Sequence, residues 1–293
     1  MGEIAASLEG VTVELIDKAR AEELGMGSFL GVARGSAEPP VMAHLVYKPK
    51  SAKKKVAFVG KGIVFDSGGL SLKPPQSMET MKMDMAGAAS VLALFKILPR
   101  LAPKVEVHGV VAFTYNMPGP DAVKPGDVLR ASNGKTIEVL NTDAEGRLIL
   151  ADALVYAGKQ GVDSIIDLAT LTGAVIIALG SKVTGVMGNN PALMRQLRAA
   201  AERADEPVCE LPLLPDYKEN VKGYIADLLN IGRARGEAGS IIGGLFLQEF
   251  VDGKPWIHMD IAGTAWTDGE GPYTPKGGTG NPVRTLVEYV TSL

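Results

Sequence analysis

The stretch Thr136-Ile-Glu-Val-Leu-Asn-Thr-Asp-Ala-Glu-Gly-Arg147 holds the change of pattern that decides the fold. Its first five residues form an apolar, strand-like run, and the residues that follow it, 148–156, have the spacing of a helix. Between the two, Asp143, Glu145 and Arg147 occupy alternate positions. Residues two apart share a face in extended or gently turning backbone. We therefore expect two carboxylates and a guanidinium to meet at one point, between a strand and a helix.

Two interpretations of this charged loop stay open when the stretch is taken alone. Hard oxygen ligands beside a permanent cation are typical of a metal site. The alternative is a solvated acidic turn ahead of the helix, because a short motif is a hypothesis until its context supports it. For Arg147, the corresponding alternative is a salt bridge at the helix start, to Glu145 or Asp152.

A second charged segment lies upstream, after the apolar strand at residues 56–59. Four charged residues there stand among large apolar side chains and glycines: Lys61, Asp66, Lys73 and Asp84. Lysine and aspartate are rarely buried unless they are paired, so this is not the pattern of a solvated face. The glycines Gly60, Gly62, Gly68 and Gly69 permit close backbone approach or positive φ. Together the two segments offer four carboxylates, two lysines and one arginine, which suits two bridged divalent ions better than one.

The rest of the chain alternates short β-rich runs with longer helical ones. Residues 105–113 and 164–169 are expected to be buried strands, and residues 80–98, 147–160, 191–204 and 240–251 have helical length and spacing. An Asn133-Gly134 dipeptide between two strand-like runs predicts a hairpin. The fold class we expect is α/β, with a mostly parallel central sheet flanked by helices on both faces. The charged segments then belong at the carboxyl ends of the strands, where the ligands of such sheets gather.

Composition and charge exclude several classes of protein. The chain has 293 residues, of which 46% are hydrophobic and 22% charged, and its net charge of −3 gives no basic footprint for nucleic acid. A single cysteine, Cys209, rules out an intramolecular disulfide, and we expect it to be a small buried apolar residue. Neither a membrane-spanning apolar run nor a signal peptide is evident, so we expect a cytoplasmic protein with no membrane partner.

Other catalytic sites find little support. The histidines His44, His108 and His258 lie in separate apolar, strand-like runs, and we expect all three to be structural. No His-Glu-x-x-His motif is present, so a thermolysin-like zinc site lacks its ligands. Ser67 stands outside the Gly-x-Ser-x-Gly pattern of a nucleophilic serine. The charged segments are therefore the best candidates for chemistry.

Three motifs carry a resemblance to a known family. They are Asn141-Thr-Asp-Ala-Glu-Gly-Arg-Leu148, then Gly60-Lys-Gly-Ile63 with Phe65-Asp-Ser-Gly-Gly69, and Lys82-Met-Asp-Met-Ala-Gly87. In order and composition they resemble the leucyl aminopeptidase family of two-metal exopeptidases. The similarity runs from about Val11 to the C-terminus, and the eight-residue motif is highly specific to that family.

The resemblance implies a dinuclear metal centre with two catalytic cations. The positions that match the family's metal ligands are Lys61, Asp66, Asp84, Asp143 and Glu145. Asp66 and Glu145 would touch both ions, while Asp143 would serve the more exchangeable one. The lysine that matches Lys73 stabilises the oxyanion, and the arginine that matches Arg147 holds a bicarbonate ion that acts as general base. The cofactors so implied are two divalent ions, Mn²⁺ or Zn²⁺, and bicarbonate.

The resemblance also implies an activity, that of a leucyl aminopeptidase. Such a hydrolase releases the first residue from peptides with a free N-terminus, using a hydroxide held between its two ions. Met81, Thr170, Gly173 and Ala262 match the residues that bind the side chain of the first residue. They offer apolar walls and no carboxylate, so leucine and other apolar residues should be preferred. The family assembles as a hexamer, and a homo-oligomer is accordingly expected.

One departure from the family concerns the N-terminus. Members usually carry an additional N-terminal domain, so we expect residues 1–293 to form a single catalytic domain that lacks it. Two other classes stay open: a two-metal phosphoesterase, which usually brings histidines, and a non-catalytic metal-bound scaffold, which would not need Lys73 and Arg147. The apolar helix at residues 241–247 is either a core helix or a subunit contact. The Gly-rich residues 269–280 form either a surface loop or a wall of the substrate cleft.

Overall fold

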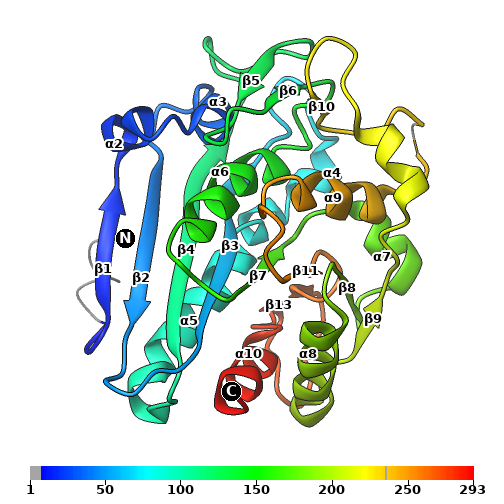
Figure 1. The fold of residues 1–293 in the computed structure, drawn as a ribbon. Helices are drawn as coiled ribbons and strands as arrows, with labels where there is room; N and C mark the ends of the chain where they lie inside the picture. The colour runs from blue at the N-terminus through cyan, green and yellow to red at the C-terminus, as the bar shows by residue number, and fades with distance from the viewer. Residues whose placement is uncertain (1–7, 235) are drawn as a thin grey trace.

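An eight-stranded sheet runs through the middle of the molecule in the computed structural model, which describes residues 8–234 and 236–293 (Figure 1). In order across the sheet, the strands are β1 (Thr12–Ile16), β2 (Val41–Tyr47), β4 (Glu106–Asn116), β3 (Lys55–Asp66), β7 (Ser164–Ala169), β11 (Trp256–Asp260), β8 (Thr184–Gly188) and β9 (Val208–Glu210). The central strands β4, β3, β7 and β11 are parallel. β1 and β2 extend one side in antiparallel fashion, and β8 pairs antiparallel with β11 before β9 joins β8 in parallel. The predicted α/β sheet is confirmed, with antiparallel pairing toward both sides.

Helices cover both faces of this sheet (Figure 1). One face packs against α3 (Gly27–Ala33), α6 (Gly146–Gly158) and α9 (Gly239–Gln248), and the other against α5 (Ala86–Leu101), α8 (Pro191–Ala204) and α10 (Val283–Thr291). Each face has its own core of buried apolar side chains. The shorter elements are α2 (Lys18–Glu23), α4 (Pro75–Met78), α7 (Gly173–Leu179), 3₁₀ helices at Met81–Met83 and Pro215–Val221, and the strands β5 (Val128–Arg130), β6 (Thr136–Glu138), β10 (Leu228–Leu229), β12 (Trp266–Thr267) and β13 (Gly277–Gly278).

Glycines allow α5 to lie directly on the sheet. A Cβ atom on Gly60 would lie 2.7 Å from the Cα atom of Ala88, and one on Gly87 would lie 2.1 Å from the carbonyl oxygen of Leu168. Both distances are far below van der Waals contact, so only glycine fits at these two positions. The close approach brings the segment that carries Asp84 next to the middle of β3.

The predicted helices are found in the structure, and the differences concern where they begin and end. The helix predicted at residues 191–204 coincides with α8, and those predicted at 147–160 and 240–251 correspond to α6 and α9. The helix predicted from Thr80 is wrong at its start, because α5 begins only at Ala86. Residues 81–83 instead form a 3₁₀ turn that directs Asp84 toward Lys61, at 2.8 Å between Oδ1 and Nζ. A buried ion pair here overrides local helical propensity.

The predicted hairpin is confirmed and leads into the charged loop. β5 and β6 pair antiparallel, and Gly134 in the turn between them has a φ of +89°. β10 adds to β6 in parallel and completes a three-stranded sheet. This small sheet delivers Asn141 to the start of α6. Ile242 and Phe246 of α9 are at most 3% exposed and Ile241 is half-buried against the same core, so this helix belongs to the core of the chain.

Two expectations about single residues need correction. His44 and His108 do not lie apart, because their rings are joined by a 3.0 Å hydrogen bond between Nε2 and Nδ1. They are brought together by the antiparallel register of β2 and β4, which pairs His44 with Val110. Cys209 is only half-buried, since β9 lies at the side of the sheet.

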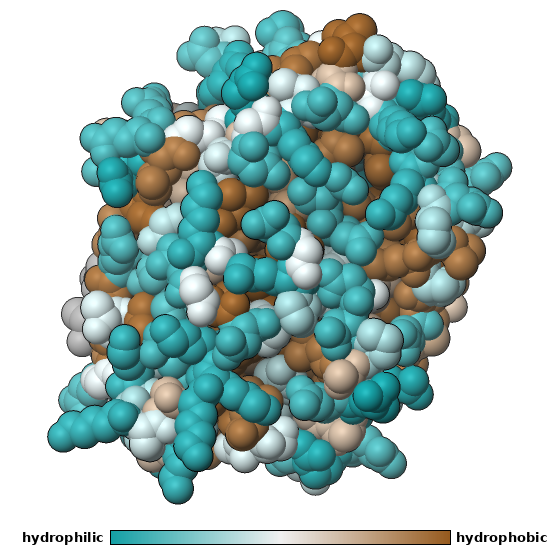
Figure 2. All heavy atoms as spheres, viewed as in Figure 1, coloured by the Kyte–Doolittle hydropathy of each residue, from teal (hydrophilic) through white to brown (hydrophobic). Residues whose placement is uncertain are grey.

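One face of the molecule is shown in space-filling form in Figure 2. Hydrophilic side chains cover most of the face seen in Figure 2, and apolar atoms show between them in small groups. Across residues 8–234 and 236–293, no helix has both the length and the apolar content needed to span a bilayer.

Candidate metal centre and active site

The charged segments of the sequence meet where the central strands end. β3 ends at Asp66, β4 at Asn116, β7 at Ala169 and β11 at Asp260, and the first turn of α6 faces this side of the sheet. The carboxyl ends of parallel strands are where open α/β sheets place their ligands. The site therefore lies where the sequence predicted it.

A bulge in β3 sets the direction of two charged side chains. Lys61 and Asp66 are five positions apart, so in a regular strand they would point to opposite faces. Ile63 pairs with Thr114 and Asp66 with Asn116, so β3 carries one extra residue at this point. Such a bulge re-aims the side chains beyond it. Both Lys61 and Asp66 consequently reach the same buried space below α6.

Lys61 is enclosed by acidic groups. Its Nζ atom lies 2.8 Å from Asp84 Oδ1 and 2.9 Å from Glu145 Oε1, and it donates to the carbonyl oxygen of Thr170 at 2.9 Å. The side chain passes so close to α6 that a Cβ atom on Gly146 would lie 2.6 Å from Lys61 Cε. This explains the glycine between Glu145 and Arg147 in the charged loop.

Lys73 lies between the other two carboxylates. Its Nζ atom is 2.9 Å from Asp66 Oδ2 and 2.5 Å from Asp143 Oδ1. Asp66 Oδ1 is held separately, by the backbone N–H of Gly68 at 2.9 Å and the side-chain amide of Asn116 at 2.8 Å. The loop from Asp66 to Lys73 can turn this tightly because Gly68 has a φ of +85°.

The four carboxylates outnumber the two lysines, and the imbalance is visible in their pKa values. Burial, together with the charge of Asp66, raises the pKa of Glu145 to about 8. Burial raises the pKa of Asp84 to about 6, against the opposing effect of Lys61. Burial lowers the pKa of Lys61, but the surrounding carboxylates outweigh it and leave that pKa raised. Burial is the largest cause at both carboxyl groups, and neighbouring negative charge raises the pKa of all three groups further.

This donor set fits divalent cations. Carboxylate oxygens of Asp66, Asp143 and Glu145 lie within 4.8 Å of one another. Asp84 Oδ2 and Glu145 Oε2 are buried and have no hydrogen-bond donor among the residues that the structure describes. Buried carboxylate oxygens normally have partners, and hard oxygen donors are the ligands that divalent ions accept. The five residues predicted as metal ligands are therefore brought together around one space, with open coordination positions.

Arg147 is a buried cation without a carboxylate partner among the residues that the structure describes. Its side chain is 7% exposed, its Nε atom has no acceptor, and it makes no ion pair within residues 8–234 and 236–293. Burial lowers its pKa to about 10, while Glu145 and Asp260 raise it. The alternative of a salt bridge to Glu145 or Asp152 is wrong. Asp152 instead accepts from the backbone N–H groups of Phe29 and Ser132, at 2.8 and 2.7 Å.

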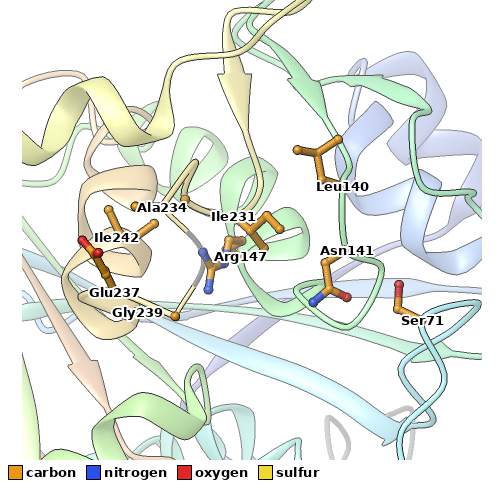
Figure 3. Close-up of a pocket in the computed structure, with 11 residues that line it drawn as sticks. Ser71, Leu140, Asn141, Arg147, Ile231, Ala234, Glu237, Gly239 and Ile242 are labelled. Atoms are coloured by element: carbon orange, nitrogen blue, oxygen red, sulfur yellow. The ribbon is translucent and has the colours of Figure 1, made fainter.

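A cavity of about 490 Å³ opens beside Arg147. Figure 3 shows the Arg147 side chain between α9 on one side and the loop that carries Asn141 on the other. The cavity is lined by Ser71, Leu140, Asn141, Arg147, Ile231, Gly232, Ala234, Gly236, Glu237, Gly239 and Ile242. Sequence analysis assigned no role to the lining residues other than Arg147. Those after β10 carry no charge pattern or motif spacing that would have identified them.

The four residues expected to bind the first side chain lie elsewhere around the site. Thr170 and Ala262 are buried, Met81 is half-buried and Gly173 is exposed at the start of α7. None of the four borders the cavity beside Arg147. Thr170 also contacts the acidic group directly, because its hydroxyl donates to Asp84 Oδ1 at 2.7 Å. Their shared role in substrate binding stays a prediction.

Polar residues that sequence analysis missed support the ligand loops. Asn116 donates to Asp66 and also to the carbonyl oxygen of Thr142, at 3.0 Å, so it joins the two charged segments. Asn230, directly after β10, accepts from the backbone N–H of Leu140 at 2.8 Å and donates to the carbonyl oxygen of Asn141 at 2.6 Å. Asn116 has no motif around it, and Asn230 lies in the run Leu228-Leu-Asn-Ile-Gly232, which resembles the family but had no role assigned to it. Only the fold brings the two residues to the loop.

Comparison with known proteins agrees with this geometry. The model of the cytosol aminopeptidase family, catalytic domain, matches residues 1–287. A probable cytosol aminopeptidase of Gloeobacter violaceus is 52% identical over 287 residues, covering 97% of this chain and 56% of the relative. Those of Thermosynechococcus vestitus and Alkaliphilus oremlandii are 53% and 52% identical, each covering 98% of this chain and 58% of the relative. The chain thus spans little more than half the length of these relatives.

Proposed function

Because the chain belongs to the cytosol aminopeptidase family, we propose that it is a metal-dependent hydrolase that releases the N-terminal residue from peptides. The observation that carries this proposal is the convergence of Asp66, Asp84, Asp143, Glu145 and Lys61 on one buried space, beside Arg147, which makes no ion pair with any described residue. Residues 1–293 supply the catalytic domain in this proposal.

Two divalent ions, Mn²⁺ or Zn²⁺, are proposed to be held by these five residues. When bound, the ions would acidify a water molecule and polarise the scissile carbonyl. Asp66 and Glu145 are the proposed shared ligands, as the resemblance to the family implies, and a carboxylate oxygen of each lies within 4.8 Å of the other. Lys61 can ligate only as a neutral amine. Dications favour that form, because they neutralise the carboxylates that raise its pKa and repel its ammonium form.

Lys73 is proposed to stabilise the oxyanion formed at the scissile carbonyl. Its side chain is 15% exposed, against 4% for Lys61, so substrate has access to it. The carboxylates of Asp66 and Asp143 raise its pKa even though burial lowers it, which keeps it a cation at neutral pH. A fixed ammonium aimed at a developing negative charge is a strong catalytic contribution.

Arg147 is proposed to hold a small planar oxyanion, with bicarbonate as the general base. The guanidinium has no carboxylate partner among the described residues, and its fork suits bidentate binding of a planar oxyanion. Gly243 on α9 leaves room beside it, because a Cβ atom there would lie 3.7 Å from Arg147 Nη2.

The peptide is proposed to lie across the site from the first-residue pocket to the cavity. Met81, Thr170, Gly173 and Ala262 would receive an apolar first side chain such as leucine, and the residues beyond the scissile bond would occupy the cavity between Asn141 and Ile242. Coordination of the free α-amine by a metal ion would limit cleavage to the first residue.

Assembly and location are also proposed from the family. We infer a hexamer, and a cytoplasmic location in line with the names of the relatives. α7 offers an exposed apolar surface, with Ile176 and Ile177 at 43% and 90% exposure, which a subunit contact would cover.

Hydrolysis of leucine p-nitroanilide, measured with and without added Mn²⁺, tests the proposed activity. The matched control is the N-acetyl derivative, which lacks the amine lone pair. We expect metal-dependent hydrolysis of the free amide alone, and faster turnover of leucine and methionine amides than of lysine or aspartate amides. Equal rates on blocked and free substrates would contradict the exopeptidase proposal. Turnover of p-nitrophenyl phosphate in place of the amides would favour the phosphoesterase alternative.

A further inference from the structure

Asp260 is a buried carboxylate at the edge of the site, and no motif identified it. It is the last residue of β11 and is 1% exposed. A carboxylate this deeply buried must be compensated by several donors to be tolerated. The groups that donate hydrogen bonds to Asp260 show which segment of the chain this carboxylate holds in place.

The donors come from the segment that follows β7. Asp260 Oδ1 accepts from the backbone N–H of Leu171 at 3.1 Å and of Thr172 at 3.4 Å, and Oδ2 accepts from the Thr172 hydroxyl at 2.6 Å. The backbone N–H of Ala262 adds a fourth contact, to Oδ1 at 3.3 Å. Thr172 also caps α7 by accepting from the N–H of Val175 at 3.2 Å. The Asp260 carboxylate therefore fixes the path of the chain both after β7 and after β11.

The fixed segment carries a residue that contacts two proposed metal ligands. Thr170 directly precedes the anchored Leu171. Its carbonyl oxygen accepts from Lys61 Nζ at 2.9 Å, and its hydroxyl donates to Asp84 Oδ1 at 2.7 Å. These two contacts set the direction of the lysine head group and select which oxygen of Asp84 stays open. Asp84 Oδ2 is the open one, without a donor among the residues described.

We propose that Asp260 is a positioning residue, which holds Thr170 against Lys61 and Asp84 and thereby sets the affinity of the metal position that these two residues form. The proposal rests on the proposed metal-dependent function. The same carboxylate anchors Ala262, Thr172 before Gly173, and Leu171 after Thr170, so three of the residues expected around the first side chain depend on it. Groups that orient metal ligands typically change metal affinity or activity by about 10–100-fold when removed.

The test is zinc affinity in the absence of substrate, measured by competition with a chromophoric chelator. Asp260→Ala should bind zinc at the position formed by Lys61 and Asp84 at least tenfold more weakly than the wild type. The matched control is Asp152→Ala. Asp152 is equally buried and accepts from two backbone N–H groups, against three for Asp260, but it joins α6 to α3 and touches no proposed ligand. Both variants should unfold at lower temperature, and only Asp260→Ala should lose zinc affinity. Zinc affinities within twofold of each other in the two variants would overturn the proposal.

Conservative variants cover the case in which Asp260→Ala does not fold. Thr172→Val removes the hydroxyl that donates to Asp260 Oδ2, and Thr172→Ser retains it. We expect weaker zinc binding for valine and near wild-type binding for serine, and equal affinity in both would overturn the proposal. Zinc affinity is independent of turnover. A wild-type chain that binds zinc without hydrolysing leucine p-nitroanilide would therefore contradict the proposed function and leave this proposal testable.

Discussion

Two buried polar clusters lie on the central sheet, and they differ in how completely their groups are paired. In the first, which we call the histidine ladder, Tyr156 Oη lies 3.2 Å from His44 Nδ1, His44 Nε2 lies 3.0 Å from His108 Nδ1, and His108 Nε2 lies 3.0 Å from Glu106 Oε1. Two lysines lie 3.6 and 3.5 Å from the Glu106 carboxylate. Each of the four ring nitrogens of His44 and His108 has a hydrogen-bond partner.

The second cluster is the acidic group of Asp66, Asp84, Asp143 and Glu145. It has two more carboxylates than lysines, and it leaves buried oxygens on Asp84 and Glu145 without donors among the described residues. A polar network that serves stability closes its hydrogen bonds internally, because an unpaired buried group is costly. The acidic group contains such unpaired oxygens despite their energetic cost, which indicates that a ligand completes the group. The ladder should therefore affect stability alone, and the acidic group should affect binding and catalysis.

The largest expected effect comes from removing the metal ions. Dialysis against a chelator should abolish peptidase activity, and restoring Mn²⁺ or Zn²⁺ should recover it. Metal analysis of the active protein should give two ions per chain, because one dication cannot satisfy four carboxylates. Full activity with one ion per chain would contradict the shared-ligand scheme. The metal-free protein should also melt at lower temperature, since a ligand present at about 100 times its Kd adds about 2.7 kcal/mol to stability.

Substitution of one lysine tests the division of roles inside the acidic group. Lys73→Ala should lower kcat on the order of 10²-fold or more, the scale of a lost oxyanion donor. It should bind metal at least as tightly as the wild type, because the Lys73 ammonium occupies the space between Asp66 and Asp143 that a cation would share. Steady-state kinetics and zinc titration measure the two effects. Metal release from Lys73→Ala, with retention by Lys61→Ala, would mean that the two lysines have exchanged roles.

The contrast between the clusters also explains what the sequence could predict. The acidic group was foreseen because Asp143, Glu145 and Arg147 are close in sequence, and charged residues among glycines and apolar side chains are conspicuous. The histidine ladder could not be predicted, because His44 and His108 are 64 positions apart and meet only through the register of β2 and β4. Strand register depends on the whole sheet and cannot be read from local pattern.

Other parts of the site could not be predicted from the sequence for similar reasons. The start of α5 was misplaced because a tertiary contact of Asp84 competes with local helix propensity. Asn116, Asn230 and Asp260 are single polar residues at strand ends, and their contacts are made with segments distant in sequence. The central strands and the hairpin were predictable, because apolar runs and an Asn-Gly turn are local signals.

A smaller effect is expected from breaking the ladder. His108→Ala removes the hydrogen-bond partner of both Glu106 and His44, and each buried group left without a partner costs about 1–3 kcal/mol. Urea unfolding should show this loss of stability, while kcat/KM and zinc affinity stay within twofold of the wild type. A large fall in zinc affinity would show that the two clusters are coupled, and it would contradict the division drawn here.

The smallest effect is a pH dependence of stability that comes from the same ladder. Burial, with the neighbouring His108, lowers the pKa of His44 from an ordinary 6.5 to about 4. The unfolded chain therefore takes up this proton at a higher pH than the folded chain does. Stability from a neutral His44 is fully present above pH 6.5 and is lost as the pH falls toward 4.

His44→Gln isolates this contribution, because glutamine can accept from Tyr156 and donate to His108 but does not titrate. The protein should be compared with the variant by urea unfolding of the metal-free forms at several pH values between 7.5 and 4.5, so that protonation of the acidic ligands affects both equally. The wild type should lose stability faster than His44→Gln as the pH falls through this window. A constant difference across the window would mean that His44 titrates alike in the folded and unfolded chains. The ladder would then not hold His44 neutral, and full pairing would no longer separate it from the acidic group.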